Sequence, residues 1–172
     1  MKKTLFGAAA LATALLAAAC GSGSTDTTDT TTSADVVVVS DAWVKASDTG
    51  MTGAFARIEN AGDSEVHVVG ASSPASATTE LHEMVSAEGT SMVMQEMGDG
   101  LVIPADTTHS LVPGGDHLML MDLTEPLRPG SEVSFTLEFA DGSTEEFTAQ
   151  VRDFAGAQEE YVPSDDGAAH GG

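Results

Sequence analysis

Hydrophobic and polar residues alternate in short runs along the chain between residues 36 and 163. Successive side chains of a β-strand point to opposite faces of its sheet, so this alternation predicts half-buried strands. Turn-forming Gly, Pro, Asp and Asn residues separate the runs, and no convincing helical periodicity extends beyond two turns. Strands are therefore predicted over Val36–Ser40, Ala54–Glu59, Glu65–Ala71, Thr79–Val85, Ser91–Met97, Thr107–Val112, His117–Leu123, Glu132–Phe139 and Glu145–Val151.

The clearest strand pair is a hairpin that turns at Asp141-Gly142, a dipeptide that accepts the positive φ angles of a tight turn. In its first arm Phe135, Leu137 and Phe139 share one face, and polar residues share the other. Short strands at 8–12-residue spacing are typical of a sandwich or barrel. The sequence predicts an all-β domain over residues 36–163, an antiparallel β-sandwich of about 125 residues, large enough for a core without disulfides.

The beginning of the chain has the layout of a secretory signal peptide. Lys2 and Lys3 precede an uncharged run rich in Ala and Leu, which ends in small residues. That run is too short for a comfortable membrane-spanning helix, so we expect residues 1–19 to be removed. Cys20 follows directly, in a setting that resembles the lipobox of bacterial lipoproteins, although Ala17 stands where that pattern prefers Leu.

This resemblance implies an extracytoplasmic protein anchored to the cell membrane by a lipid on Cys20; a plainly secreted protein is the alternative. We predict that residues 20–35 comprise the lipidated cysteine and a flexible tether, because residues 21–34 contain no large apolar side chain. Residues 164–172 are predicted to be a disordered tail for the same reason.

The charge balance excludes several partners. The chain carries 27 acidic against 6 basic residues, a formal net charge of -21. Nucleic acids and anionic lipid headgroups attract Lys and Arg, so neither is an expected partner. A single cysteine, Cys20, outside the predicted domain, excludes an intrachain disulfide, a thiolate zinc site and a blue-copper site.

Methionine and histidine gather between residues 82 and 121, which hold six of the eight methionines and three of the five histidines. Side chains two residues apart in a strand face the same way. The intervening Leu118 and Leu120 would then face the core. The sets that share a face are His82 with Met84, Met92 with Met94, and His117 with Met119 and Met121.

These residue types favour a copper site. Soft thioethers with imidazoles suit Cu(I) and poorly suit Mg²⁺, Ca²⁺ or Mn²⁺, which prefer oxygen. A thioether carries neither proton nor charge, so such a site could release Cu(I) to a thiolate acceptor. The two H-x-M units, His82/Met84 and His117/Met119, support this hypothesis together.

Ordinary packing is the competing interpretation, since methionine commonly fills gaps in cores. Taken singly, Met51, Met97 and Met121 are expected to pack. His67, His109 and His170 are not expected to be ligands, and zinc bound by His82, His109 and His117 would leave the methionines unexplained. The absence of G-x-S-x-G and H-E-x-x-H motifs predicts that the protein is not an enzyme. Without a metal, the alternative function is a lipid-anchored β-sandwich interaction or adhesion module.

The motif resembles that of the periplasmic PCu(A)C copper chaperones, in which a His is followed about a dozen residues later by a Met and then by H-x-M. By position the resemblance implies His82, Met94, His117 and Met119 as metal ligands. The loop before His117 is one residue longer than the family pattern, and Met92 competes with Met94. Further likenesses, such as Asp41-Ala42-Trp43, extend the resemblance over roughly residues 39 to 152.

Membership of this family would imply a cupredoxin-like sandwich that binds Cu(I) outside the cytoplasm. It would also imply a role in supplying the CuA centre of cytochrome c oxidase. The expected partners are therefore the copper ion and a copper-accepting protein, such as cytochrome c oxidase subunit II or another copper chaperone.

Overall fold

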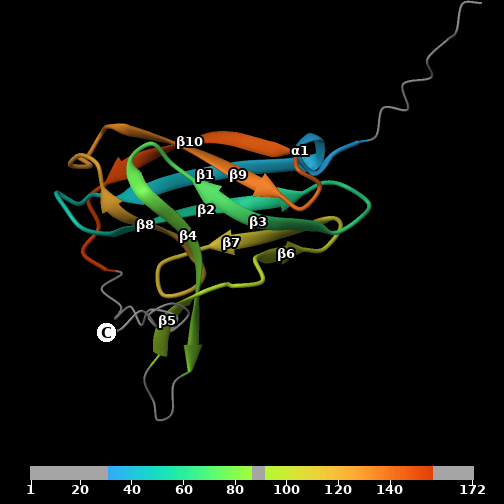
Figure 1. The fold of residues 1–172 in the computed structure, drawn as a ribbon, viewed down its shortest axis with the longest axis horizontal. Coiled ribbons are helices and arrows are strands. Elements are labelled where there is room, and N and C mark those ends of the chain that lie inside the picture. The colour runs from blue at the N-terminus through green and yellow to red at the C-terminus, as the bar shows by residue number, and fades with distance from the viewer. Residues whose placement is uncertain (1–30, 87–91, 157–172) are drawn as a thin grey trace, which may run out of the picture. The chain divides into compact units, whose positions relative to one another are not determined.

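A computed structural model describes residues 31–86 and 92–156, which form one short helix and ten strands (Figure 1). Residues 1–30, with the predicted signal peptide and Cys20, and residues 157–172, with the predicted tail, lie outside the described part. The elements are α1 (Ser33–Val36), β1 (Val37–Lys45), β2 (Thr52–Asn60), β3 (Val66–Ser72), β4 (Ser76–Ser86), β5 (Met92–Glu96), β6 (Leu101–Ile103), β7 (Thr107–Leu111), β8 (His117–Leu123), β9 (Glu132–Phe139) and β10 (Thr144–Arg152).

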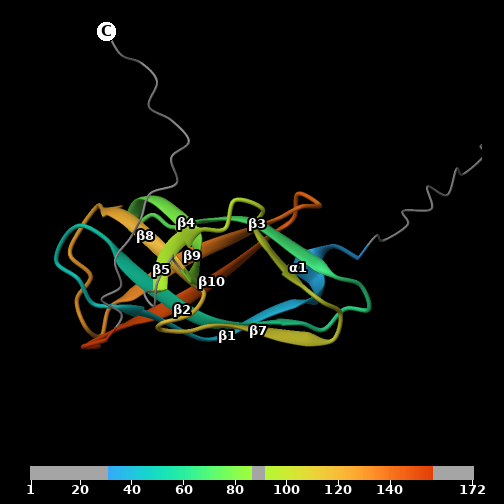
Figure 2. The ribbon, with the colours of Figure 1, turned by 90° about the horizontal axis from the view of Figure 1, so that it is seen from below.

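The strands form one sheet in the order β5-β4-β8-β2-β1-β10-β9-β3-β6, and β7 pairs with β2. The sheet bends over, so that β1, β2 and β7 lie in one layer and β3, β4 and β8 in the facing layer (Figure 2). This arrangement confirms the predicted all-β architecture. One pair departs from the antiparallel pattern: β1 and β10 run parallel, with Trp43 opposite Gln150 and Lys45 opposite Arg152.

The core lies between the layers. Phe135, Leu137 and Phe139 of β9 are almost completely buried, as their shared face predicted, and Leu118 and Leu120 of β8 join the same cluster. Burying a side chain of this size stabilises the fold by roughly 1.5–3 kcal/mol. Within the described residues, no helix has the length and apolar character needed to cross a membrane.

Two differences from the predicted strands have a local cause. Strand β1 was predicted to end at Ser40 but continues to Lys45. It passes through an irregularity at Asp41, which has a φ of 53°, and the register with β2 shifts between Ser40 and Trp43. The three-residue strand β6 was not predicted, because Leu101–Ile103 is too short for alternation to stand out.

The predicted hairpin turns at Asp141-Gly142, where Gly142 has a φ of 83°. The carboxylate of Asp141 also holds the start of the domain. It accepts hydrogen bonds from the hydroxyl and the backbone N–H of Ser143, at 2.6 and 2.9 Å, and from the backbone N–H of Ser33, at 2.6 Å. These donors, the Ser143 hydroxyl foremost, hold the pKa of the Asp141 carboxyl well below its usual range. Helix α1 thus overlaps the last residues of the stretch predicted as tether and is bound to the β9–β10 turn.

We predict that Asp141→Ala lowers the free energy of unfolding at pH 7 by about 1 kcal/mol, since it removes solvent-exposed hydrogen bonds to a charged group. The folded-state pKa of Asp141 is depressed, so its stabilisation is fully present above the unfolded pKa of about 3.9 and fades as pH falls below it. Urea unfolding should therefore show a smaller difference between wild type and variant at pH 2 than at pH 7. Asp153→Ala, another exposed aspartate, is the control; a loss of equal size at both pH values would contradict this role.

Candidate metal site

The four predicted ligands lie on three neighbouring strands, with His82 on β4, Met94 on β5, and His117 and Met119 on β8. Strand β4 is the middle strand, because it pairs with β5 on one side and β8 on the other. The β4–β8 register puts His82 directly opposite His117, and the β4–β5 register puts Met84 opposite Met94. Pairing of the strands thus gathers residues that lie far apart in the sequence.

His117 and Met94 approach each other most closely, with Nε2 of the imidazole 2.8 Å from the Sδ of the thioether. On the other side of the ring, Nδ1 donates a hydrogen bond to the carbonyl oxygen of Gly115 at 2.8 Å. A carbonyl oxygen can only accept, so a neutral His117 carries its lone pair on Nε2, directed at Met94. Two electron-pair donors of a type that binds soft metal ions therefore face one point.

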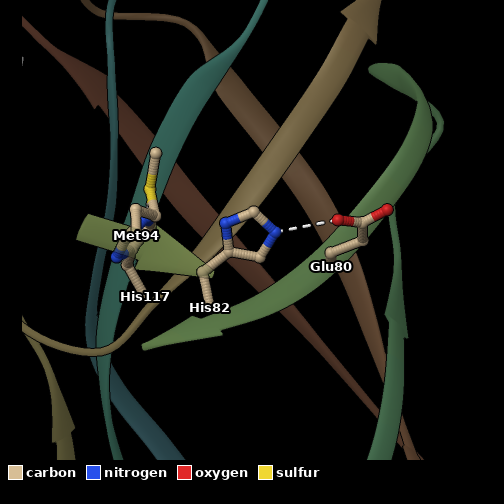
Figure 3. A network of polar contacts seen from close by, with 4 residues as sticks. All are labelled: Glu80, His82, Met94 and His117. Carbon is tan, nitrogen blue, oxygen red and sulfur yellow. Dashed lines mark hydrogen bonds and ion pairs between the residues drawn. The ribbon is translucent and has the colours of Figure 1, made fainter. Parts of the chain in front are cut away.

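His82 is oriented in a similar way. Its Nε2 donates to Oε2 of Glu80 at 2.8 Å, and its ring centroid lies 5.7 Å from that of His117. Figure 3 shows the ring between Glu80 on one side and the pair formed by Met94 and His117 on the other. The carboxylate acceptor fixes the neutral tautomer with the lone pair on Nδ1. Partners of this kind orient ligating histidines.

Met119 completes the group through a pocket of about 200 Å³. Met94, His117 and Met119 all line this pocket, whereas His82 lies beside His117 outside that lining. The lining comprises Lys45, Ala46, Ser47, Met51, Thr52, Gly53, Phe55, Met94, Gly114, His117 and Met119.

All four predicted ligands are buried: His82 is 0% exposed, Met94 3%, His117 5% and Met119 6%. They nevertheless lie apart from the main hydrophobic cluster, as predicted for the face opposite Leu118 and Leu120. Alternation alone did not show that this face would be covered. Burial excludes bulk water, which strengthens any interaction between an ion and these donors.

The structure places Met94, and not Met92, at the pocket. The Met92 side chain is 51% exposed, and its Sδ accepts a hydrogen bond from the Ser86 hydroxyl at 3.5 Å. Met84, directly opposite Met94 on β4, is half-buried.

The other histidines have separate partners. His67 contacts the carbonyl oxygen of Asp99 at 2.6 Å, and His109 contacts the carboxylate of Asp116 at 2.9 Å. His170 lies outside the described residues. Residues 31–86 and 92–156 contain no group of three or more His, Cys, Asp or Glu side chains that could hold a metal ion, so they do not form the zinc set of His82, His109 and His117.

Sequence reasoning missed two supporting groups. Glu80 stands two residues before His82, and strand periodicity could have identified it as a neighbour on the same face. An aromatic series could not have been found in that way: Phe55 lies 6.1 Å from the His117 ring and 4.5 Å from Trp43, between ring centroids. Because Trp43 is the only tryptophan, its fluorescence should report changes at the site.

Comparisons with known proteins show which family and which solved structures this chain is similar to. The family model "Putative lipoprotein LpqE-like" matches residues 37–151. A relative described as "Putative lipoprotein Lxx21020", from Leifsonia xyli subsp. xyli, is 49% identical over 128 residues, which cover 74% of this chain and 76% of the relative.

Among solved structures, the chain is similar to DR1885 from Deinococcus radiodurans. The solution structure of its CuI form is 32% identical, and the match covers 72% of this chain and 82% of the DR1885 chain. The TM-score is 0.54. The apo form is 30% identical, and the match covers 90% of this chain and 98% of the DR1885 chain. Its TM-score is 0.55.

A copper-bound PCuAC domain from PmoF2 shares the fold alone, with 16% identity, coverage of 69% of this chain and 94% of that domain, and a TM-score of 0.55. These findings confirm the predicted fold class and the resemblance to PCu(A)C domains.

We predict that Glu80→Gln lowers the affinity for Cu(I) about 10–100-fold, the usual effect of losing a partner that orients a ligating histidine. Glutamine keeps the size of the side chain but removes the negative charge that holds the Nε2–H tautomer of His82. Anaerobic competition with a chromophoric Cu(I) chelator measures the change. Glu83→Gln is the matched control on the same strand, because Glu83 instead accepts a hydrogen bond from Gln95. Equal losses in both variants would show that general charge, and not the Glu80–His82 contact, sets the affinity.

Proposed function

Because this chain belongs to the LpqE-like lipoprotein family, we propose that it is an extracytoplasmic carrier of Cu(I), anchored to the membrane through a lipid on Cys20. It is a binding protein and not an enzyme. The CuI form of DR1885, which is 32% identical to this chain, supports copper as the cargo. The domain would hold one ion on His82, Met94, His117 and Met119 and pass it to a partner.

The observation that carries this proposal is the convergence of His117 Nε2 and Met94 Sδ, 2.8 Å apart, at a pocket that Met119 also lines. Imidazole and thioether donors are neutral and soft, and they therefore favour Cu(I) over harder divalent ions. Charge would be balanced at longer range, since the chain as a whole carries a net charge of -21.

The donor set also explains release. No thiolate belongs to the described residues, because the single cysteine is Cys20. Thiolates are soft anionic ligands that bind Cu(I) more strongly than neutral thioethers, so transfer to a thiolate acceptor is favourable. The acceptor we propose is the CuA centre of cytochrome c oxidase in its subunit II, or another copper chaperone that leads to it. The predicted tether before α1 would let the anchored domain reach that partner.

Anaerobic titration of the mature chain should show one equivalent of tightly held Cu(I), and His117→Ala/Met119→Ala should lose at least about 100-fold in affinity because it removes two of four donors. His109→Ala is the control, since His109 contacts Asp116 and lies outside the pocket lining.

The fluorescence of Trp43 gives a second readout, through its contact with Phe55 beside His117. Retention of full affinity in the double variant would overturn the copper site. The metal-free interaction module would then be the better account of the fold and the anchor.

A further inference from the structure

A third methionine lines the pocket beside Met94 and Met119. It is Met51, in the loop between β1 and β2. Sequence analysis assigned Met51 to packing, but its side chain is 47% exposed, against 3% for Met94 and 6% for Met119. Of the exposed large apolar side chains among the described residues, Met51 is the one that lines this pocket.

Hydrogen bonds fix the backbone around Met51. The hydroxyl of Thr52 donates to the carbonyl oxygen of Lys45 at 2.8 Å, across the loop, and the N–H of Leu123 donates to the carbonyl oxygen of Gly50 at 3.0 Å. Two residues after Met51, Gly53 pairs with Met119 of β8. Met51 is therefore held next to the strand that carries two of the proposed ligands.

Burial of the four proposed ligands creates a problem for transfer. Their exposed fractions of 0–6% leave little surface on which a donor or acceptor protein could take hold of the ion directly. Met51 is the thioether that the same pocket presents to the outside. A copper ion that enters the pocket from solvent would therefore reach Met51 before the buried ligands.

We propose that Met51 is an outer copper ligand, which binds Cu(I) during loading and release and is not part of the resident set. This inference rests on the proposed function of the site. As the Met51 Sδ–Cu bond forms, one bond from copper to its previous ligand breaks. Copper stays in the +1 state, and no proton moves, because a thioether carries none. Copper is bound to at least one protein ligand throughout the exchange. Met51 would therefore lower the activation barrier for transfer of the ion.

The first test compares Met51→Leu with the matched control Met92→Leu in the mature chain. Leucine conserves volume and apolar character, so neither variant is expected to disturb the fold. Met92 is likewise exposed, at 51%, but is not a pocket-lining residue. We expect Met51→Leu to slow transfer of Cu(I) to a chromophoric chelator about tenfold, with a smaller change in affinity at equilibrium. Wild-type transfer rates in Met51→Leu would overturn the proposal.

The second test separates this proposal from the proposed function. Methionine methyl groups labelled with ¹³C are followed by NMR while less than one equivalent of Cu(I) is added without oxygen. Shifts at Met94 and Met119, exchange broadening of the Met51 signal and an unchanged Met92 signal are the expected result, because the ion visits Met51 only in passing. Shifts at Met94 and Met119 with an unchanged Met51 signal would overturn the role of Met51 and leave the copper site standing. No shift at any methionine would overturn both.

Discussion

The position of β4 between β5 and β8 is the constraint on which the site depends. Side chains on one strand are fixed relative to those on the next only through the register of backbone hydrogen bonds. Here that register sets His82 opposite His117 and Met84 opposite Met94. A slip of one residue in either pairing would turn the histidine or the methionine to the opposite face. The hydrophobic residues of β8 resist such a slip, because Leu118 and Leu120 would have to leave the core.

Burying imidazoles is costly unless their polar atoms have partners, and the site meets this requirement with short local contacts. Gly115 receives the N–H of His117 from within the same turn, and Glu80 receives that of His82 from two residues earlier on the same strand. The same contacts leave the lone pairs where an ion could use them. The same hydrogen bonds thus stabilise the fold and orient the imidazoles toward the pocket.

The sequence predicted the strands well where alternation was long, as in His117–Leu123 and Glu132–Phe139, whose limits coincide with β8 and β9. It also proposed His82, Met94, His117 and Met119, which the structure brings together. A period of two tells which face a residue occupies, but not which strand lies beside it or what covers that face. Choosing Met94 over Met92 and recognising the parallel pairing of β1 with β10 required the three-dimensional structure, whereas the position of Glu80 beside His82 was open to strand periodicity.

The parallel pairing of β1 with β10 has a consequence for how the chain reaches this structure. The first and last strands are direct neighbours, and Ser33 contacts Asp141 across a separation of 108 residues. Contacts between such distant segments form late, because closing a long loop loses chain entropy before the contacts repay it. During synthesis, the edge of β1 that pairs with β10 has no partner strand until the end of the chain has emerged. Topology of this kind favours slow folding, and the unpaired edge of β1 is open to pairing with other chains until β10 covers it.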